Sequence, residues 1–324
     1  MLSHHELLEQ VNAAIAAIKY PVAPEGLYEP IEYAISIGGK RIRPVMLLLA
    51  AQALGTDTRK AMPAAIGLET YHNYTLLHDD LMDRADMRRG MPTVHRKWDS
   101  NTAILSGDSM LVLACKQILS TEMPNVHEVM NLFVKTALEI GEGQQYDMNF
   151  ETRTDVTQDE YIEMIRLKTS VLIACAAKMG AILSDASAEV ANRLYKFGEQ
   201  VGLAFQLQDD LLDVYGNPEV FGKRIGGDIL CNKKTFLAIN AFLLANDHQR
   251  AELNRWISLA DFDEQEKISA VTDIYNQLDI KAITSDKINH YFTEAQCTLD
   301  AVDMAAEGKQ LLRDFANSLL GRGA

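Results

Sequence analysis

The sequence predicts an all-α fold, and three observations support this prediction. Apolar residues recur at spacings of three and four in nearly every segment between Pro or Gly residues. These segments are rich in Ala, Leu, Met, Glu and Gln, which favour helices. The alternating pattern of strands is almost absent. We therefore expect one helical-bundle domain over residues 1–324, because no Ser/Gly-rich linker divides the chain.

The expected helices follow one another along the whole chain. They are predicted at about residues 4–19, 27–37, 43–54, 62–83, 101–120, 126–149, 158–182, 187–213 and 233–245, with several more up to 320. The segments that carry chemistry lie between residues 38 and 235. Residues 245–320 hold amphipathic helices with few clustered functional side chains, which predicts a scaffold.

Composition and charge exclude several classes of partner. A chain of 324 residues with 48% hydrophobic content can bury a large core. Its net charge of -14 argues against nucleic acid or an anionic membrane as the main partner, because both attract basic surfaces. The most apolar run, Val45 to Ala51, is too short to span a bilayer, so no membrane span is expected. The four scattered cysteines have no CxxC spacing, which fits a protein of the reducing cytoplasm.

Two acidic motifs are the strongest functional signal in the sequence. Each reads L-x-D-D-L-x-D, and their aspartates are Asp79, Asp80 and Asp83, and Asp209, Asp210 and Asp213. On a helix the first and last aspartates of each motif are neighbours, so their negative charges repel each other and destabilise the helix. A bound cation would offset this repulsion. Hard oxygen ligands at this spacing suit Mg²⁺, which shares its coordination with substrate phosphates. A solvated acidic helix end is the alternative for one motif, but two apolar-embedded copies favour the metal.

The helical face that carries each motif continues toward the N-terminus of its helix. Helical spacing places His72 and Leu76 in line with the first motif, and Gly202 and Gln206 in line with the second. Gly202 lacks a side chain, which would leave room either for a ligand or for a close helix contact.

Cations that would bind phosphate occur at two turns near the first motif. In Gly38-Gly39-Lys40-Arg41-Ile42-Arg43-Pro44, a glycine turn enters a helix whose first turn suits Pro44. A helix N-terminus with added Lys and Arg binds phosphate, although the Gly pair also fits an ordinary loop. Arg88 and Arg89 follow the first motif, and the alternative for them is an exposed basic turn.

Further lysines accompany the second motif. Lys168 falls in an apolar helical stripe, where it either serves a site or extends to the surface. A turn-rich stretch lies beyond the second motif. It offers additional cations at Lys223, which follows Gly222, and at Lys233 and Lys234, which accompany Asp228.

Together these motifs resemble the trans-polyprenyl diphosphate synthase family over about residues 31–235. The matching strings are GGKRIRP, HNYTLLHDDLMD, DMRRGMPTVH, SGD, GQQYD, RLKTS, FQLQDDLLDVYG and GKRIGGDILCNKKT. The resemblance implies the all-α isoprenoid synthase fold with a central cavity. It also implies an Mg²⁺-dependent prenyltransferase that condenses isopentenyl diphosphate with dimethylallyl, geranyl or farnesyl diphosphate. A homodimer is the family's usual assembly.

The resemblance also implies a role for individual residues. Those expected to bind isopentenyl diphosphate are Lys40, Arg43, His72 and Arg89. Those expected to contact the allylic diphosphate are Arg88, Lys168, Lys223 and Lys233. Thr169 and Gln206 would line the site near the reacting allylic carbon. A trinuclear Mg²⁺ cluster would be held mainly by Asp79, Asp83 and Asp209, with Asp80 and Asp213 in support and Asp210 in the same motif.

Product length in this family depends on residues just before the first motif, here Tyr74 and Thr75. An aromatic residue at the first of these positions resembles short-chain synthases, with C20 favoured and C15 next. By helix geometry, the Tyr74 side chain either closes the end of the product tunnel or contacts a neighbouring helix. The competing functions are a terpene cyclase, a non-catalytic subunit of a heteromeric synthase, and an acidic helical interaction protein.

Overall fold

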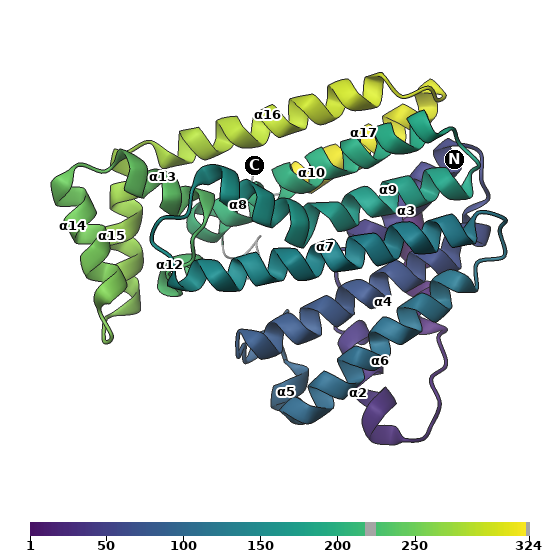
Figure 1. Cartoon of the computed structure of the whole chain (residues 1–324), viewed down its shortest axis with the longest axis horizontal. Helices are drawn as coiled ribbons and strands as arrows, with labels where there is room; N and C mark the ends of the chain where they lie inside the picture. Colours follow the sequence, from purple (N-terminus) through teal and green to yellow (C-terminus); the bar gives the residue numbers. More distant parts are fainter. Residues whose placement is uncertain (218–224, 322–324) are drawn as a thin grey trace. The chain divides into compact units, whose positions relative to one another are not determined.

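The structure is a computed structural model that describes residues 1–217 and 225–321 (Figure 1). The regular secondary structure of the described part is helical except for two strands of two residues each, which confirms the predicted all-α fold class. Its elements are α1 (His4–Ala16), α2 (Glu25–Ser36), α3 (Ile42–Ala53), α4 (Thr58–Met82), β1 (Met87–Arg88), β2 (Met91–Pro92), α5 (Val94–Lys97), α6 (Ser100–Leu119), α7 (Val126–Thr152), α8 (Gln158–Ile165), η1 (Arg166–Ser170), α9 (Val171–Leu183), α10 (Ala188–Tyr215), α12 (Gly227–Leu230), α13 (Phe236–Leu244), α14 (Asp247–Ser258), α15 (Glu264–Gln277), α16 (Ile280–Asp300) and α17 (Ala306–Leu320).

Side-chain caps explain where several of these helices begin. Asp57 accepts a hydrogen bond from the backbone N–H of Arg59 and starts α4. Thr157 and Glu160 form a reciprocal capping box at the start of α8. The prediction of one continuous α-helix over residues 158–182 is wrong. The π-helical segment η1 interrupts this helix and separates α8 from α9.

The chain divides into two compact units by its internal contacts. Unit 1 comprises Met1–Lys135, Cys175–Tyr195 and Ala301–Phe315, and unit 2 comprises Thr136–Ala174, Lys196–Asp300 and Ala316–Ala324. Helices α7, α9, α10 and α17 contribute residues to both units. The first acidic motif belongs to unit 1 and the second to unit 2.

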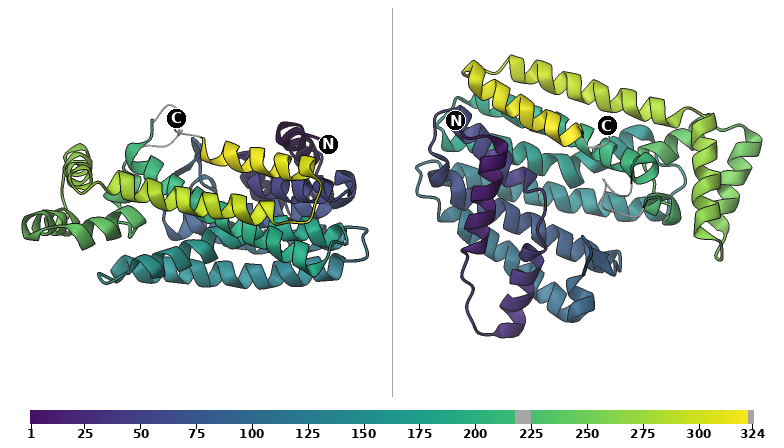
Figure 2. Two further views of the ribbon diagram at one scale, coloured as in Figure 1. Left: turned by 90° about the horizontal axis from the view of Figure 1, so that it is seen from above. Right: turned by 180° about the vertical axis from the view of Figure 1, so that it is seen from behind.

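Unit 1 is built around α3 and α4. Every residue of α3 except Arg43 is buried, because this segment is apolar on all sides. Helix α4 packs against α3 and, over much of its length, against α6 (Figures 1 and 2). A cluster formed by Ile31, Leu77 and Met110 joins α2, α4 and α6. This packing fixes the C-terminal end of α4, where the first motif lies.

One helix of unit 1 leaves apolar side chains exposed. On α6, the exposed fractions are 46% for Ile104, 60% for Leu105 and 67% for Val112. This helix is also long and apolar enough to cross a membrane by length and composition alone. That criterion is weak evidence for a membrane span, because core helices of soluble proteins meet it as well.

Unit 2 packs its core around the second motif. Apolar residues of α8, α10, α13, α14, α15 and α16 contribute to one buried cluster that includes Tyr161, Leu207, Trp256 and Tyr275. Helices α14 and α15 pack on each other, and α15 also contacts α12, α13 and α16 (Figure 1). The short helix α12 therefore lies between the end of the second motif and α15.

Candidate active site

The first acidic motif occupies the C-terminal end of α4. Asp79 is half-buried and Asp83 is exposed, whereas only 5% of Asp80 is exposed. Both carboxylate oxygens of Asp80 accept hydrogen bonds from Arg88 Nε, at 2.8 and 2.7 Å. Arg88 Nη2 lies 2.7 Å from Asp80 and 4.0 Å from Asp79. Burial raises the pKa of Asp80, and Arg88 opposes this rise. Asp80 thus holds the Arg88 guanidinium beside Asp79.

The second motif, on α10, repeats this pattern with different partners. Asp209 and Asp213 are partly exposed, whereas only 2% of Asp210 is exposed. The Tyr161 hydroxyl donates to one carboxylate oxygen of Asp210, and Gln206 Nε2 donates to the other at 3.0 Å. Burial, followed by the charge of Asp228, raises the pKa of Asp210.

In both motifs the outer aspartates are accessible and the middle one is buried. Among the described residues, no three Asp, Glu, His or Cys side chains form a ready-made metal cluster. Two accessible carboxylates per motif nevertheless fit Mg²⁺, which binds through one or two carboxylates together with substrate phosphates. Metal binding by the six aspartates stays a prediction. Asp80 and Asp210 already have both carboxylate oxygens hydrogen-bonded, which favours a supporting role for them.

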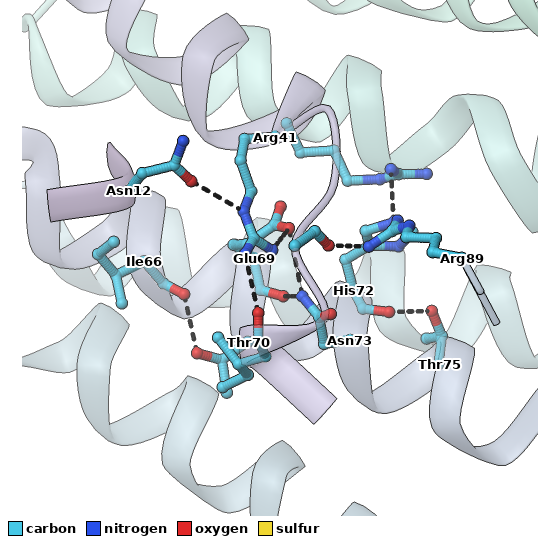
Figure 3. A network of polar contacts seen from close by, with 12 residues as sticks. Asn12, Arg41, Ile66, Glu69, Thr70, His72, Asn73, Thr75 and Arg89 are labelled. Carbon is cyan, nitrogen blue, oxygen red and sulfur yellow. Dashed lines mark hydrogen bonds and ion pairs between the residues drawn. The ribbon is translucent and has the colours of Figure 1, made fainter. Parts of the chain in front are cut away.

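Unit 1 brings Arg89 close to His72 on α4, the helix that carries its acidic motif (Figure 3). Arg43 Nη1 lies 3.0 Å from His72 Nε2. Burial lowers the pKa of His72 well below its usual value, and the guanidinium groups of Arg43 and Arg89 lower it further. A neutral His72 therefore accepts a hydrogen bond from Arg43 through Nε2.

The glycine turn before α3 is shaped by Arg89. The Arg89 guanidinium donates to the Gly38 carbonyl and lies against Gly39, where a Cβ atom would collide with it. Gly38 and Gly39 have φ values of 85° and 145°, which L side chains rarely adopt. The turn thus needs both glycines, and it links the predicted Lys40 and Arg43 to Arg89. A small pocket in unit 1 is lined by Asp80, Arg88 and Arg89.

Arg41 does not serve as a surface cation of this turn. Its Nη1 lies 2.7 Å from Glu69 Oε1, and the two side chains are 3% and 4% exposed. Arg41 also donates to the Ile35 carbonyl at 2.8 Å and to Asn12 Oδ1 at 3.3 Å (Figure 3). Arg41 stands among the cations of this turn in the sequence but is not one of the residues predicted to bind substrate, and its burial against Glu69 was not predicted. The missed signal was Glu69, a lone acid in an otherwise apolar stretch of α4.

The π-helical segment η1 carries the predicted Lys168 and Thr169. Lys168 Nζ pairs with Asp147 Oδ2 at 2.6 Å. A Cβ atom at Gly143 would collide with the backbone of Lys168, and one at Gly202 would collide with Ser170. Gly202 therefore allows a close helix contact. Both glycines let neighbouring helices approach the widened turn, and π-helical turns often occur at functional sites.

A chain of hydrogen bonds links this segment to the second motif. Thr169 Oγ1 donates to Gln206 Oε1 at 3.1 Å, and the amide of Gln206 donates in turn to Asp210. Tyr161 donates to Asp210 from the opposite side. The buried aspartate thus orients Gln206, and Gln206 orients Thr169.

The turn after α12 carries Lys233. Its Nζ lies 3.7 Å from Asp228 Oδ1. The backbone N–H of Asp228 donates to Asp213 Oδ2 at 2.9 Å, which ties α12 to the last aspartate of the second motif. Lys223, also predicted to contact substrate, lies outside the described residues.

Comparison with known proteins decides the family. A polyprenyl synthetase family model matches residues 24–275. The chain belongs to the polyprenyl synthetase family. This synthetase is 49% identical to a geranylgeranyl diphosphate synthase of Methanosarcina mazei over 72% of both chains. It is 35% identical to a geranylfarnesyl diphosphate synthase of Natronomonas pharaonis over 98% of this chain and 96% of that one.

Solved structures agree with this assignment. A crystal structure of a geranylgeranyl pyrophosphate synthase matches with a TM-score of 0.95 and 42% identity over 100% of both chains. A geranylgeranyl pyrophosphate synthetase from Geoglobus acetivorans matches with a TM-score of 0.88 and 35% identity, over 98% of this chain and 99% of that one. The predicted family and prenyltransferase class are confirmed, and the terpene cyclase and the non-catalytic subunit are not favoured.

The residues predicted to limit product length in this synthetase lie on α4. Tyr74 is half-buried, with ring centroids of Tyr71 and His78 at 5.4 and 4.8 Å. Beneath it, Tyr71 meets the buried Phe133 edge-on at 5.0 Å. The Thr75 hydroxyl instead donates to the His72 carbonyl of its own helix at 2.8 Å. Tyr74 has a larger side chain than Thr75, and its ring packs on Tyr71, which in turn packs on Phe133.

Proposed function

We propose that this chain condenses isopentenyl diphosphate with an allylic diphosphate to give a short all-trans prenyl diphosphate, with C20 as the favoured product. The observation that carries the proposal is the repeated motif, in which accessible outer aspartates flank a buried middle one. Family membership and relatives named as geranylgeranyl diphosphate synthases support the reaction class and the product length.

Two sets of cations would bind the two diphosphates. For isopentenyl diphosphate we propose Lys40, Arg43, His72 and Arg89. The contact between Arg43 and His72 and the packing of Arg89 on the glycine turn support this grouping. For the allylic diphosphate we propose Arg88, Lys168, Lys223 and Lys233. In unit 1, Arg88 lies beside Asp79 of the first motif. In unit 2, Lys233 lies beside Asp228 of α12.

Catalysis would begin with breakage of the allylic carbon–oxygen bond. Mg²⁺ held mainly by Asp79, Asp83 and Asp209, with Asp213 in support, would supply Lewis-acid stabilisation of the departing diphosphate. Arg88, Lys168 and Lys233 would meet the same developing charge with preorganised donors.

The double bond of isopentenyl diphosphate would then attack the allylic cation and form the new carbon–carbon bond. Loss of a proton to the released diphosphate restores a double bond. Thr169 and Gln206, already oriented by Asp210, would line the reacting carbon.

A product assay tests this proposal directly. The protein is incubated with Mg²⁺, isopentenyl diphosphate and dimethylallyl, geranyl or farnesyl diphosphate, and the products are dephosphorylated and chromatographed. We expect elongation that depends on Mg²⁺ and stops mainly at C20. Absence of any elongated product would refute the proposed function, and a C15 or C25 end point would refute only the proposed length.

Replacing Tyr74 by alanine should lengthen the product. Removing the Tyr74 ring opens space beside α4, and the rings of Tyr71 and Phe133 limit how far this space extends. We therefore expect products that are at least one C5 unit longer. The measurement is the product distribution by chromatography. Tyr74→Phe is the matched control, because it keeps the ring and should keep the wild-type length. Unchanged products in Tyr74→Ala would contradict Tyr74 as the floor.

A homodimer through α6 is a further part of the proposal. Leu105 and Val112 lie two turns apart on one face of α6 and are largely exposed. A row of exposed apolar residues typically marks an interaction surface.

Val112→Glu should convert a dimer of the wild-type chain into monomers, because a carboxylate would be buried in the interface. Light scattering after gel filtration measures the mass. Val22→Glu is the control, since Val22 is 92% exposed and belongs to the segment between α1 and α2, outside α6. A Val112→Glu protein that stays dimeric would contradict this interface.

The remaining parts of the proposal concern organisation and location. We propose that the two units act as one catalytic domain, because four helices contribute residues to both. A cytoplasmic location is supported by the cysteines, none of which forms a disulfide among the described residues.

A further inference from the structure

Lys267 on α15 is a buried lysine in the region expected to be scaffold. Only 1% of it is exposed, and burial lowers its pKa. Its Nζ donates to Asn232 Oδ1 at 2.8 Å and to the Leu230 carbonyl at 3.2 Å. The ring centroid of Phe262 lies 4.2 Å from the same nitrogen. Within residues 1–217 and 225–321, the partners of this nitrogen are a carbonyl, an amide and a ring, without a carboxylate. Burying an ammonium without a counter-charge is costly, so this lysine needs an explanation beyond packing.

Both oxygens that Lys267 contacts belong to the segment leading into Lys233. Leu230 is the last residue of α12. Asn232 follows in the left-handed conformation, with φ at 54°, and its position sets the direction in which the chain leaves the turn. The next residue is Lys233, whose backbone N–H donates to the Asp228 carbonyl at 2.9 Å. Lys267 thus fastens the turn from one side while Asp228 fastens it from the other.

The other end of α12 is also held by α15 and by the second motif. A Cβ atom on Gly226 would collide with the Ile268 side chain, so α15 packs directly on the turn that opens α12. Asp213 accepts from the backbone N–H groups of Gly226 and Asp228. Two consecutive residues of α15 therefore contact the two ends of α12: Ile268 packs at its start and Lys267 binds at its end.

The cavity beside Lys267 does not have the size of a substrate site. It is lined by Lys233, Trp256 and Val271 among others, and its volume is about 40 Å³. Such a space holds a few water molecules and not a prenyl chain. The described contacts of the Lys267 ammonium, with Asn232, Leu230 and Phe262, are all made within the protein.

We propose that Lys267 is a positioning residue that fixes the Cys231–Asn232 turn so that the ammonium of Lys233 is presented to the allylic diphosphate. This inference rests on the proposed function, in which Lys233 binds that diphosphate. It gives α15 a part in catalysis.

The experiment compares Lys267→Met with Val271→Ala, a packing variant on the same helix and in the same cavity. In Lys267→Met the apolar chain keeps its volume and the unpaired charge is gone, so the thermal midpoint should not fall. Loss of the turn's support should raise KM for the allylic substrate and lower its kcat/KM by about 10- to 100-fold, the range usual for supporting contacts. KM for isopentenyl diphosphate should not change. Val271→Ala should lower the midpoint and leave the KM values of both substrates unchanged.

A double substitution identifies the route of the effect. If Lys267 acts through Lys233, Lys267→Met should have no further effect on allylic kcat/KM in a Lys233→Met background. Asn232→Gly is the second variant, because glycine suits the left-handed turn. It removes the amide oxygen that accepts from Lys267, together with the amide's long hydrogen bond to the Ile257 carbonyl. It should raise allylic KM in the same direction, and it decides the question if Lys267→Met does not fold.

An active wild type with unchanged allylic kcat/KM in Lys267→Met would overturn the inference. Equal losses for both substrates, or full additivity with Lys233→Met, would overturn it as well. A wild-type chain that transfers no prenyl group would refute the proposed function itself, which is a distinct outcome.

Discussion

Replacing Asp79 or Asp209 by asparagine should lower kcat/KM for prenyl transfer by about 100- to 1,000-fold. Each substitution keeps the side-chain size and removes one carboxylate that we assign to Mg²⁺. A Lewis-acid metal contributes several kcal/mol of transition-state stabilisation, and about 1.4 kcal/mol corresponds to a factor of ten. Steady-state kinetics over a range of Mg²⁺ concentrations should also show half-maximal activity displaced to higher Mg²⁺.

Two substitutions serve as controls for this prediction. Asp86→Asn removes a carboxylate whose side chain is 73% exposed and paired with Arg96, and it should leave kcat/KM unchanged. Asp210→Asn removes one of the two acceptors that hold Gln206 and Tyr161. It should lower kcat without displacing the Mg²⁺ dependence. An Asp79→Asn or Asp209→Asn enzyme with wild-type kinetics would contradict the ligand assignment.

Replacing Glu69 by alanine should lower the free energy of unfolding by about 3–5 kcal/mol, because it leaves the Arg41 guanidinium buried without its counter-charge. Asn73 would lose its bond to Glu69 Oε1 as well. The loss should extend to function, since Arg41 lies between the predicted substrate cations Lys40 and Arg43. Urea unfolding measures the stability, and KM for isopentenyl diphosphate, expected to rise, reports on the turn.

A double substitution separates the pair from its surroundings. Replacing both Arg41 and Glu69 by methionine removes both buried charges and keeps apolar volume, so its cost should be well below the sum of the single changes. Glu69→Gln keeps an acceptor for Asn73 and should cost less than Glu69→Ala. A Glu69→Ala protein as stable as the wild type would show that the pair contributes nothing to unit 1.

Most helices were predictable because their sequence period is strong. The all-apolar segment that forms α3 and the long pattern that forms α4 are examples, and both segments are largely buried in the structure. The two acidic motifs were also predictable, because their spacing places the outer aspartates on one helical face. The matching exposure of these aspartates follows from that spacing.

Other features depend on contacts that the sequence does not display. The π-helical segment at Arg166–Ser170 coincides with close approaches at Gly143 and Gly202, which belong to other helices. The inward turn of Arg41 depends on Glu69, 28 residues away. In the sequence, Lys267 cannot be told from a surface lysine. Its burial is evident only from the structure, where it contacts the turn after α12. Local patterns cannot record such long-range partners.

The central claim is that the outer aspartates of both motifs jointly hold Mg²⁺ against the allylic diphosphate. Calorimetric titration with geranyl diphosphate, in the absence of isopentenyl diphosphate, tests it most directly. We predict tight binding that requires Mg²⁺ and is lost both in Asp79→Asn and in Asp209→Asn. Equally tight binding without Mg²⁺, or wild-type binding by either variant, would contradict the claim.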